Sequence, residues 1–125
     1  MLFKLNVGTV SGENIDQPKH ELPPSIVVNR IAESLRIVTG DAGRVISYRF
    51  EKSDGGDWDA ETIVVATIDI PSATWIDEVC RCVAVYARQD CVASIGIDDE
   101  TIEGLTFHPN YSGQEFSFDP AYFIK

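Results

Sequence analysis

The 125-residue chain lacks several features that would assign it to a common functional class. It has no apolar run of the roughly 18 residues that a membrane helix requires. Its first residues contain no basic stretch followed by a sustained apolar segment, so no signal peptide is expected. It has three cysteines, and this odd number fits a reducing cytoplasm better than a disulfide framework. We therefore expect a soluble, cytoplasmic protein that does not contact membranes.

Basic residues are also scarce, and they never cluster. Ten Lys and Arg stand against 20 Asp and Glu, which gives a formal net charge of -10 at pH 7. A surface this negative repels phosphate backbones, so direct nucleic-acid binding is disfavoured. The charge favours a cationic protein surface or a divalent ion as partner, or serves only to keep the protein in solution.

Catalytic and ligand-binding motifs are missing as well. No motif links His20 or His108 to a nucleophile, so a surface or packing role is favoured over general-base catalysis. No Gly-rich phosphate loop is present. Cys80 and Cys82 lie two apart in a predicted helix and point in different directions, which favours buried structural thiols over a zinc half-site. We expect no metal site, no cofactor and no catalytic residue, although an enzyme remains an alternative.

The periodicity of the apolar residues predicts an α+β fold. The length and an apolar content of 44% suit one globular domain. The expected elements are strands over 3–10, 46–50, 62–70 and 91–97, a helix opened by Pro23-Pro24-Ser25 and ended by Gly40, and a helix over about 74–89. The order strand, helix, strand, strand, helix, strand is typical of the ferredoxin-like βαββαβ fold, a four-stranded antiparallel sheet with both helices on one face.

Two of these elements carry more specific expectations. The strand over 62–70 is apolar on both sides, which predicts a central position in the sheet. In the second helix, Thr74 and Asp77 approximate a capping box, and Ile76, Val79, Val83 and Tyr86 form the expected inward stripe.

Residues 98–125 follow the predicted core of residues 1–97 as an acidic turn and an irregular tail. The tail carries six of the 12 aromatic residues. We expect it to fold back over the open face of the sheet. The alternative is an aromatic patch for a partner or for a second copy of the chain.

The predicted topology also places the acidic residues. The loops after the first strand, between the second and third strands, and before the last strand lie at one end of the sheet, and together they form a negative rim. A smaller acidic patch, Asp98-Asp99-Glu100 with Glu103, belongs at the opposite end. The predicted partner-binding residues in the rim are Glu51, Asp54, Asp57, Trp58, Asp59, Glu61 and Asp90.

Two stretches resemble a group of small uncharacterised proteins of bacteria, prophages and phages. The segment 86–94 is similar to a Gln-Asp/Glu-Cys-Ile-Ala segment of that group, with Val92 in place of Ile. The ending 118–124 resembles its Phe-Asn-Pro-x-Tyr-Phe close, with Asp119 in place of Asn. The resemblance implies a mobile-element context and carries no activity with it.

Taken together, the sequence predicts a non-enzymatic interaction protein. It would present the acidic rim to a basic protein surface, such as that of a host nucleic-acid-handling or defence factor. The alternative is a binding protein for a metabolite or nucleotide, which would use the open sheet face under the aromatic tail. The sequence also allows homo-oligomers that form through an edge strand or through the tail.

Overall fold

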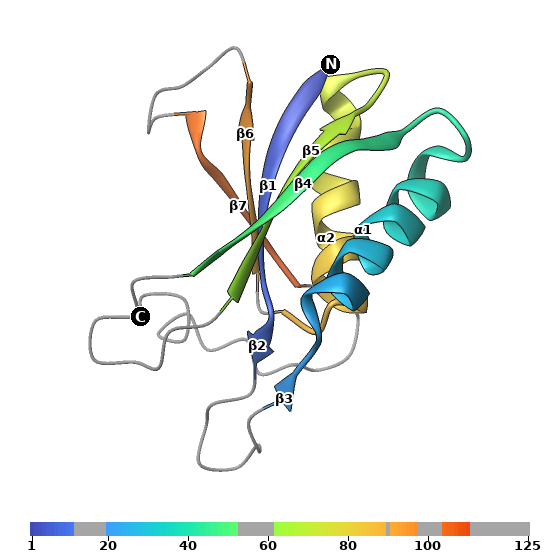
Figure 1. Ribbon diagram of the computed structural model, residues 1–125. Helices are drawn as coiled ribbons and strands as arrows, with labels where there is room; N and C mark the ends of the chain where they lie inside the picture. The colour runs from blue at the N-terminus through green and yellow to red at the C-terminus, as the bar shows by residue number, and fades with distance from the viewer. Residues whose placement is uncertain (12–19, 53–61, 90, 98–103, 111–125) are drawn as a thin grey trace.

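The computed structural model describes residues 1–11, 20–52, 62–89, 91–97 and 104–110 (Figure 1). In this part of the chain, a five-stranded antiparallel sheet carries two helices on one face, an α+β arrangement. The elements in chain order are β1 Leu2–Gly8, β2 Val10–Ser11, β3 His20–Glu21, α1 Pro24–Thr39, β4 Arg44–Lys52, β5 Thr62–Asp69, the 3-10 turn η1 Ala73–Trp75, α2 Ile76–Tyr86, β6 Cys91–Gly96 and β7 Thr106–Pro109.

The strand order of the sheet is β4-β5-β1-β6-β7, with β2 and β3 forming a separate short ribbon. The α+β class predicted from the sequence is confirmed, but the sheet has five strands where four were expected. The added strand comes from the tail that was predicted to be irregular. Residues 106–109 pair with β6, with Thr106 opposite Ser94 and Pro109 opposite Cys91. This part of the tail therefore extends the sheet at its edge.

The first helix follows the sequence closely. Pro24 occupies its first turn, where a missing N–H costs no hydrogen bond. Gly40 ends it with a positive φ of 66°, a conformation that glycine adopts without strain, and its N–H donates to the Arg36 carbonyl. Val27, Ile31 and Leu35 recur every four residues and are buried against the sheet.

The central position of β5 is confirmed. β5 lies between β4 and β1; it is buried on the helix face and buried or half-buried on the other. Val64, Ala66 and Ile68 point to the helices, because they lie opposite the core residues Val7 and Leu5 and the half-buried Phe3 of β1. Val65 is buried on the other face.

The second helix differs from the expectation at both ends. The hydroxyl of Ser72 accepts the Thr74 N–H and caps η1, so the predicted capping box of Thr74 and Asp77 is wrong. The inward stripe is Val79, Cys80, Val83 and Ala84. Tyr86, predicted to point inward, is exposed near the end of the helix. Within the described ranges, no helix combines the length and apolar character that crossing a membrane demands.

The core between α1 and the sheet should dominate the stability of the fold. Ile31 is fully buried in it, whereas Ile37 on the same helix is exposed. We expect Ile31→Ala to lower the free energy of unfolding by about 2–5 kcal/mol, since it removes transfer energy and leaves a cavity. Ile37→Ala is the matched control, with a change within about 0.5 kcal/mol. Urea unfolding measures both, and equal losses would contradict the assignment of the buried face.

Candidate functional site

Charge is distributed unevenly between the described residues and the segments outside them. The segments 12–19, 53–61, 90, 98–103 and 111–125 contain 13 of the 20 acidic residues and two of the ten Lys and Arg. Their formal charge is therefore -11, and that of the described residues is +1. The described residues are thus close to neutral in sum, and the acidic excess lies in the sequence of the other segments.

Most of these segments are attached at the same end of the sheet. The strand register brings Gly8 opposite Ile63, Lys52 opposite Thr62, and Cys91 opposite Pro109. The strands β1, β4 and β7 end and β5 and β6 begin at this end of the sheet, which is the lower end in Figure 1. The segments 53–61, 90 and 111–125 therefore attach there, and segment 12–19 follows β1 through the ribbon of β2 and β3. The segment 98–103 leaves from the opposite end, after Gly96 of β6 and before β7.

Of the predicted partner-binding residues, only Glu51 lies within the described part of the chain. It is exposed near the end of β4, where its Oε1 accepts a hydrogen bond of 2.7 Å from Arg49 Nε. A neighbouring cation therefore offsets its charge locally. The other predicted residues lie outside the described residues: Asp54, Asp57, Trp58, Asp59, Glu61 and Asp90.

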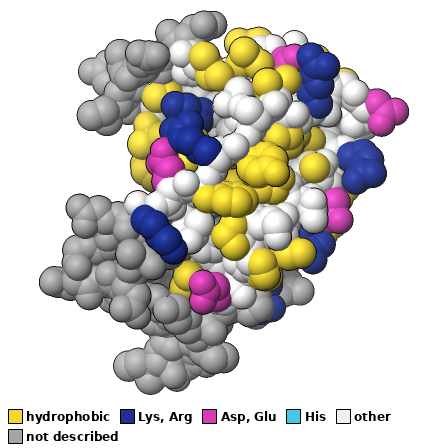
Figure 2. All heavy atoms as spheres, viewed as in Figure 1, with side chains coloured by type: hydrophobic (Ala, Val, Ile, Leu, Met, Phe, Trp, Pro, Cys, Tyr) yellow, Lys and Arg dark blue, Asp and Glu magenta, His cyan; other side chains and the backbone are white. Residues whose placement is uncertain are grey.

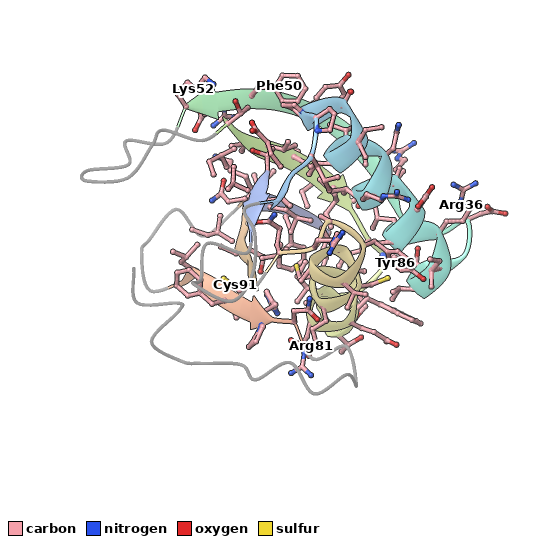
Figure 3. All side chains as sticks on the ribbon, turned by 90° about the horizontal axis from the view of Figure 1, so that it is seen from below. Arg36, Phe50, Lys52, Arg81, Tyr86 and Cys91 are labelled. Atoms are coloured by element: carbon pink, nitrogen blue, oxygen red, sulfur yellow. The ribbon has the colours of Figure 1, made fainter. Side chains whose placement is uncertain are left out.

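The strand that leads into segment 53–61 has an unusual surface. β4 forms one edge of the sheet, and eight of its nine residues are exposed. Tyr48 and Phe50 point to the helix side, because they lie opposite Ala66 and Val64, yet they remain 54% and 49% exposed. Their ring centroids are 5.7 Å apart. Figure 2 shows hydrophobic side chains gathered over this region, and Figure 3 places Phe50 and Lys52 at the outer margin of the sheet.

A second cluster lies under the opposite edge and joins three elements. His108 of β7 makes two hydrogen-bond contacts, from Nε2 to Ser94 Oγ on β6 and from Nδ1 to Asp77 Oδ1 on α2, each 2.8 Å long. Asp77 Oδ2 also lies 3.0 Å from Arg81 Nε, one helical turn further on. Ser94 and His108 are buried, with exposed fractions of 3% and 2%.

The protonation of this cluster follows from its partners. The hydrogen bond with His108 is the main cause that lowers the pKa of Asp77, and Arg81 lowers it further against the opposing effect of partial burial. Because an ionised carboxylate only accepts, His108 Nδ1 carries a proton and donates it to Asp77. In a neutral His108, Nε2 then accepts the Ser94 hydroxyl. Burial raises the pKa of Cys80, beside Ser94, so Cys80 stays a thiol at neutral pH.

The residue types are those of a Ser-His-Asp hydrolase, but their accessibility is reversed. In that chemistry the serine meets the substrate and the acid stands behind the histidine. Here Ser94 is buried, whereas the Asp77 side chain is 55% exposed. A substrate carbonyl therefore has no access to the Ser94 hydroxyl. The arrangement instead fastens β7 to β6 and α2, with further hydrogen bonds from Asn110 Nδ2 to the carbonyls of Ala84 and Gln89.

Sequence reasoning missed this cluster. It assigned His108 a surface or packing role in an irregular tail, without partners, and it placed Asp77 in a helix cap. The alternation of Thr106, Phe107 and His108 was the only local sign of a strand. Phe107 is 63% exposed and His108 is buried, as such alternation predicts. Nothing in the sequence links His108 to Asp77, 31 positions earlier.

The remaining candidate ligands do not come together in the described part of the chain. Among the described residues, no group of three or more His, Cys, Asp or Glu side chains is placed to hold a metal ion. None of the three cysteines forms a disulfide with another; Cys80 is buried and the other two are half-buried. The face of the sheet opposite the helices carries Lys4, Asn6 and Thr67, all half-buried. Its use by a small molecule stays a prediction.

No protein-family model, curated protein or solved structure matches this sequence. The resemblance to phage and prophage proteins therefore stays a prediction.

The hydrogen bond between Asp77 and His108 should contribute to stability. We expect Asp77→Ala to lower the free energy of unfolding by about 1 kcal/mol, because it removes the acceptor of a buried donor. Asp77→Asn keeps an acceptor and should lose less. Glu78→Ala is the control, since Glu78 lies in the same first turn and feels the same helix dipole.

This contribution should depend on pH in a defined direction. Because folding lowers the pKa of Asp77, its stabilisation is fully present above the ordinary value of 3.8 and is lost as the pH falls through the lower, folded value. Urea unfolding from pH 7 to pH 2.5 should show the difference between the parent and Asp77→Ala shrinking only at the acidic end. A difference that is constant over the whole series would contradict this role.

Proposed function

We propose that the protein is a non-enzymatic interaction module that presents acidic segments to a basic protein surface. The observation that carries this proposal is the division of charge: the described residues have a formal charge of +1, and the segments outside them have -11. Eight of the 15 charged side chains among the described residues form ion pairs with one another, as in Arg30–Glu33, Arg44–Asp69 and Arg81–Asp77.

The location of the excess favours binding over solubility alone. Charge that only keeps a protein in solution works best when both signs are interspersed over the whole surface. Here the segment 53–61 holds four acidic residues and no basic one, and it is flanked by Lys52 and Thr62 at the end of the sheet where most of the acidic segments attach. A concentrated negative field of this kind accelerates association with a positive surface and repels other polyanions.

We infer that the partner is a protein whose basic surface holds nucleic acid, such as a host nucleic-acid-handling or defence factor. A groove that binds phosphate backbones is lined with Lys and Arg, and these would also attract the acidic segments. The mobile-element context implied by the C-terminal motifs supports this class of partner. We also infer that the fold is the ferredoxin-like arrangement enlarged by one strand, which is supported by the order β4-β5-β1-β6 of the other four strands.

Charge reversal at one end of the molecule tests the proposal. The tagged protein is used to capture partners from host lysate at low salt, and mass spectrometry identifies them. We expect a basic nucleic-acid-binding protein that is released at high salt, because the contact is largely electrostatic. The double variant Asp54→Lys/Asp57→Lys should weaken its binding by about tenfold or more.

The matched control is Asp98→Lys/Asp99→Lys, which makes the same change in net charge in the segment attached at the opposite end. It should retain most of the binding. A DNA or RNA duplex added to the complex should compete with the acidic protein for the partner. Equal losses in the two double variants would show that net charge alone matters, and a complex indifferent to nucleic acid would rule out an overlapping site.

A further inference from the structure

The outer edge of β4 is unpaired within the described structure and is built differently from the opposite edge of the sheet. β7 offers only four residues and ends at Pro109, which has no N–H to donate. β4 offers nine residues, with a bulge between Val45 and Ser47, so its regular stretch runs from Ser47 to Lys52. A long, exposed edge strand with apolar side chains is a template for pairing with another strand.

We propose that a second copy of this chain is the occupant, pairing its β4 antiparallel to this one about a twofold axis at Phe50. The two five-stranded sheets then join into one continuous sheet. This inference does not depend on the acidic segments, because it rests on the sequence and geometry of β4 alone.

The twofold axis restricts the register. Residues directly opposite in an antiparallel pair point to the same side of the sheet, so a symmetric pair must place residues of one face of β4 opposite each other. The axis therefore passes midway between the two copies of one residue, which lie directly opposite each other. An axis at Arg49 or Glu51 sets like charges directly opposite, which is destabilising. An axis at Tyr48 sets Lys52 opposite Arg44 and draws the bulge into the pair.

An axis at Phe50 avoids all of these conflicts. It pairs only residues 48–52, on the regular side of the bulge. Arg49 then lies opposite Glu51 of the partner subunit, and the reverse pair forms on the other side of the axis. Since Arg49 and Glu51 already form an ion pair within the chain, the four charges alternate in sign around the axis.

The aromatic side chains complete the contact on the helix side. The two copies of Phe50 meet at the axis, and Tyr48 lies opposite Lys52 of the partner subunit. Aromatic cross-strand pairs and a cation beside an aromatic ring each add to the stability of a strand pair. Both Tyr48 and Phe50 are about half exposed in the single chain, so pairing buries surface that is apolar.

Sedimentation velocity on the purified chain tests the pairing without any other protein. The range from about 1 µM to about 1 mM covers the affinities that small interfaces reach. We expect a reversible change from monomer to dimer. A chain that stays monomeric throughout, or that forms assemblies larger than a dimer, would overturn the proposal.

Charge-swapped variants test the register. Arg49→Glu sets like charges opposite across the axis, as does Glu51→Arg, and each should weaken dimerisation by at least tenfold. The double variant Arg49→Glu/Glu51→Arg restores opposite signs and should dimerise to within about threefold of the parent. Circular dichroism checks that each variant is folded, and the restored dimer of the double variant guards against a loss caused by misfolding.

Phe107→Lys is the control for the other edge, because Phe107 is exposed on β7. It should leave the dimer intact. A dimer that survives both single β4 variants, or one that the β7 variant disrupts instead, would place the interface elsewhere and overturn the proposal. The double variant Asp54→Lys/Asp57→Lys leaves β4 unchanged, so a lost partner and a lost dimer are separate results.

Discussion

The structure depends on burying one face of a five-stranded sheet beneath only two helices. Strands lie about 4.8 Å apart, so the outer strands of such a sheet are separated by about 19 Å. Two helices of about 10 Å diameter barely span that width. The three inner strands, β5, β1 and β6, receive full cover, as the complete burial of Leu5, Ala66 and Val92 shows. The two edge strands, β4 and β7, receive less cover from the helices, and their side chains differ in the contacts that they make.

At one edge the structure uses polar contacts. β7 is short and brings little apolar surface of its own, since Phe107 points to solvent. His108 and Asn110 instead hydrogen-bond to α2, to β6 and to the Gln89 carbonyl, in positions where an unpaired polar group would be costly. At the other edge, no hydrogen bond of this kind holds Tyr48 or Phe50 within the described part of the chain, and both rings stay about half exposed on the helix side of the sheet. Among the described residues, β4 therefore keeps an exposed aromatic surface where β7 has buried polar contacts.

This difference also explains which parts of the fold could be predicted. Val27, Ile31 and Leu35, with Gly40, specify α1 within the helix itself, and the unbroken apolar run of β5 specifies a central strand. Such signals are local, so the sequence contains them in full. The hydrogen bond between Asp77 and His108 joins residues 31 positions apart, and β7 forms only because β6 is there to pair with it. Contacts of this kind depend on the tertiary structure and leave almost no local pattern. The acidic segments were apparent from composition, but all the predicted binding residues except Glu51 lie outside the described residues.

The two proposals concern different parts of the surface. Pairing β4 about Phe50 sets the two copies of Lys52 four positions apart along the strands, a distance of about 14 Å. Because the two strands run antiparallel, the chains leave this contact in opposite directions, and each acidic segment 53–61 follows Lys52 at its own end of the contact. At physiological ionic strength the Debye length is about 8 Å, so exposed charges this far apart are largely screened from each other. Salt should therefore act on dimerisation mainly through the contact between Arg49 and Glu51 of the partner subunit, and a basic protein bound to the acidic segments should leave dimerisation almost unchanged.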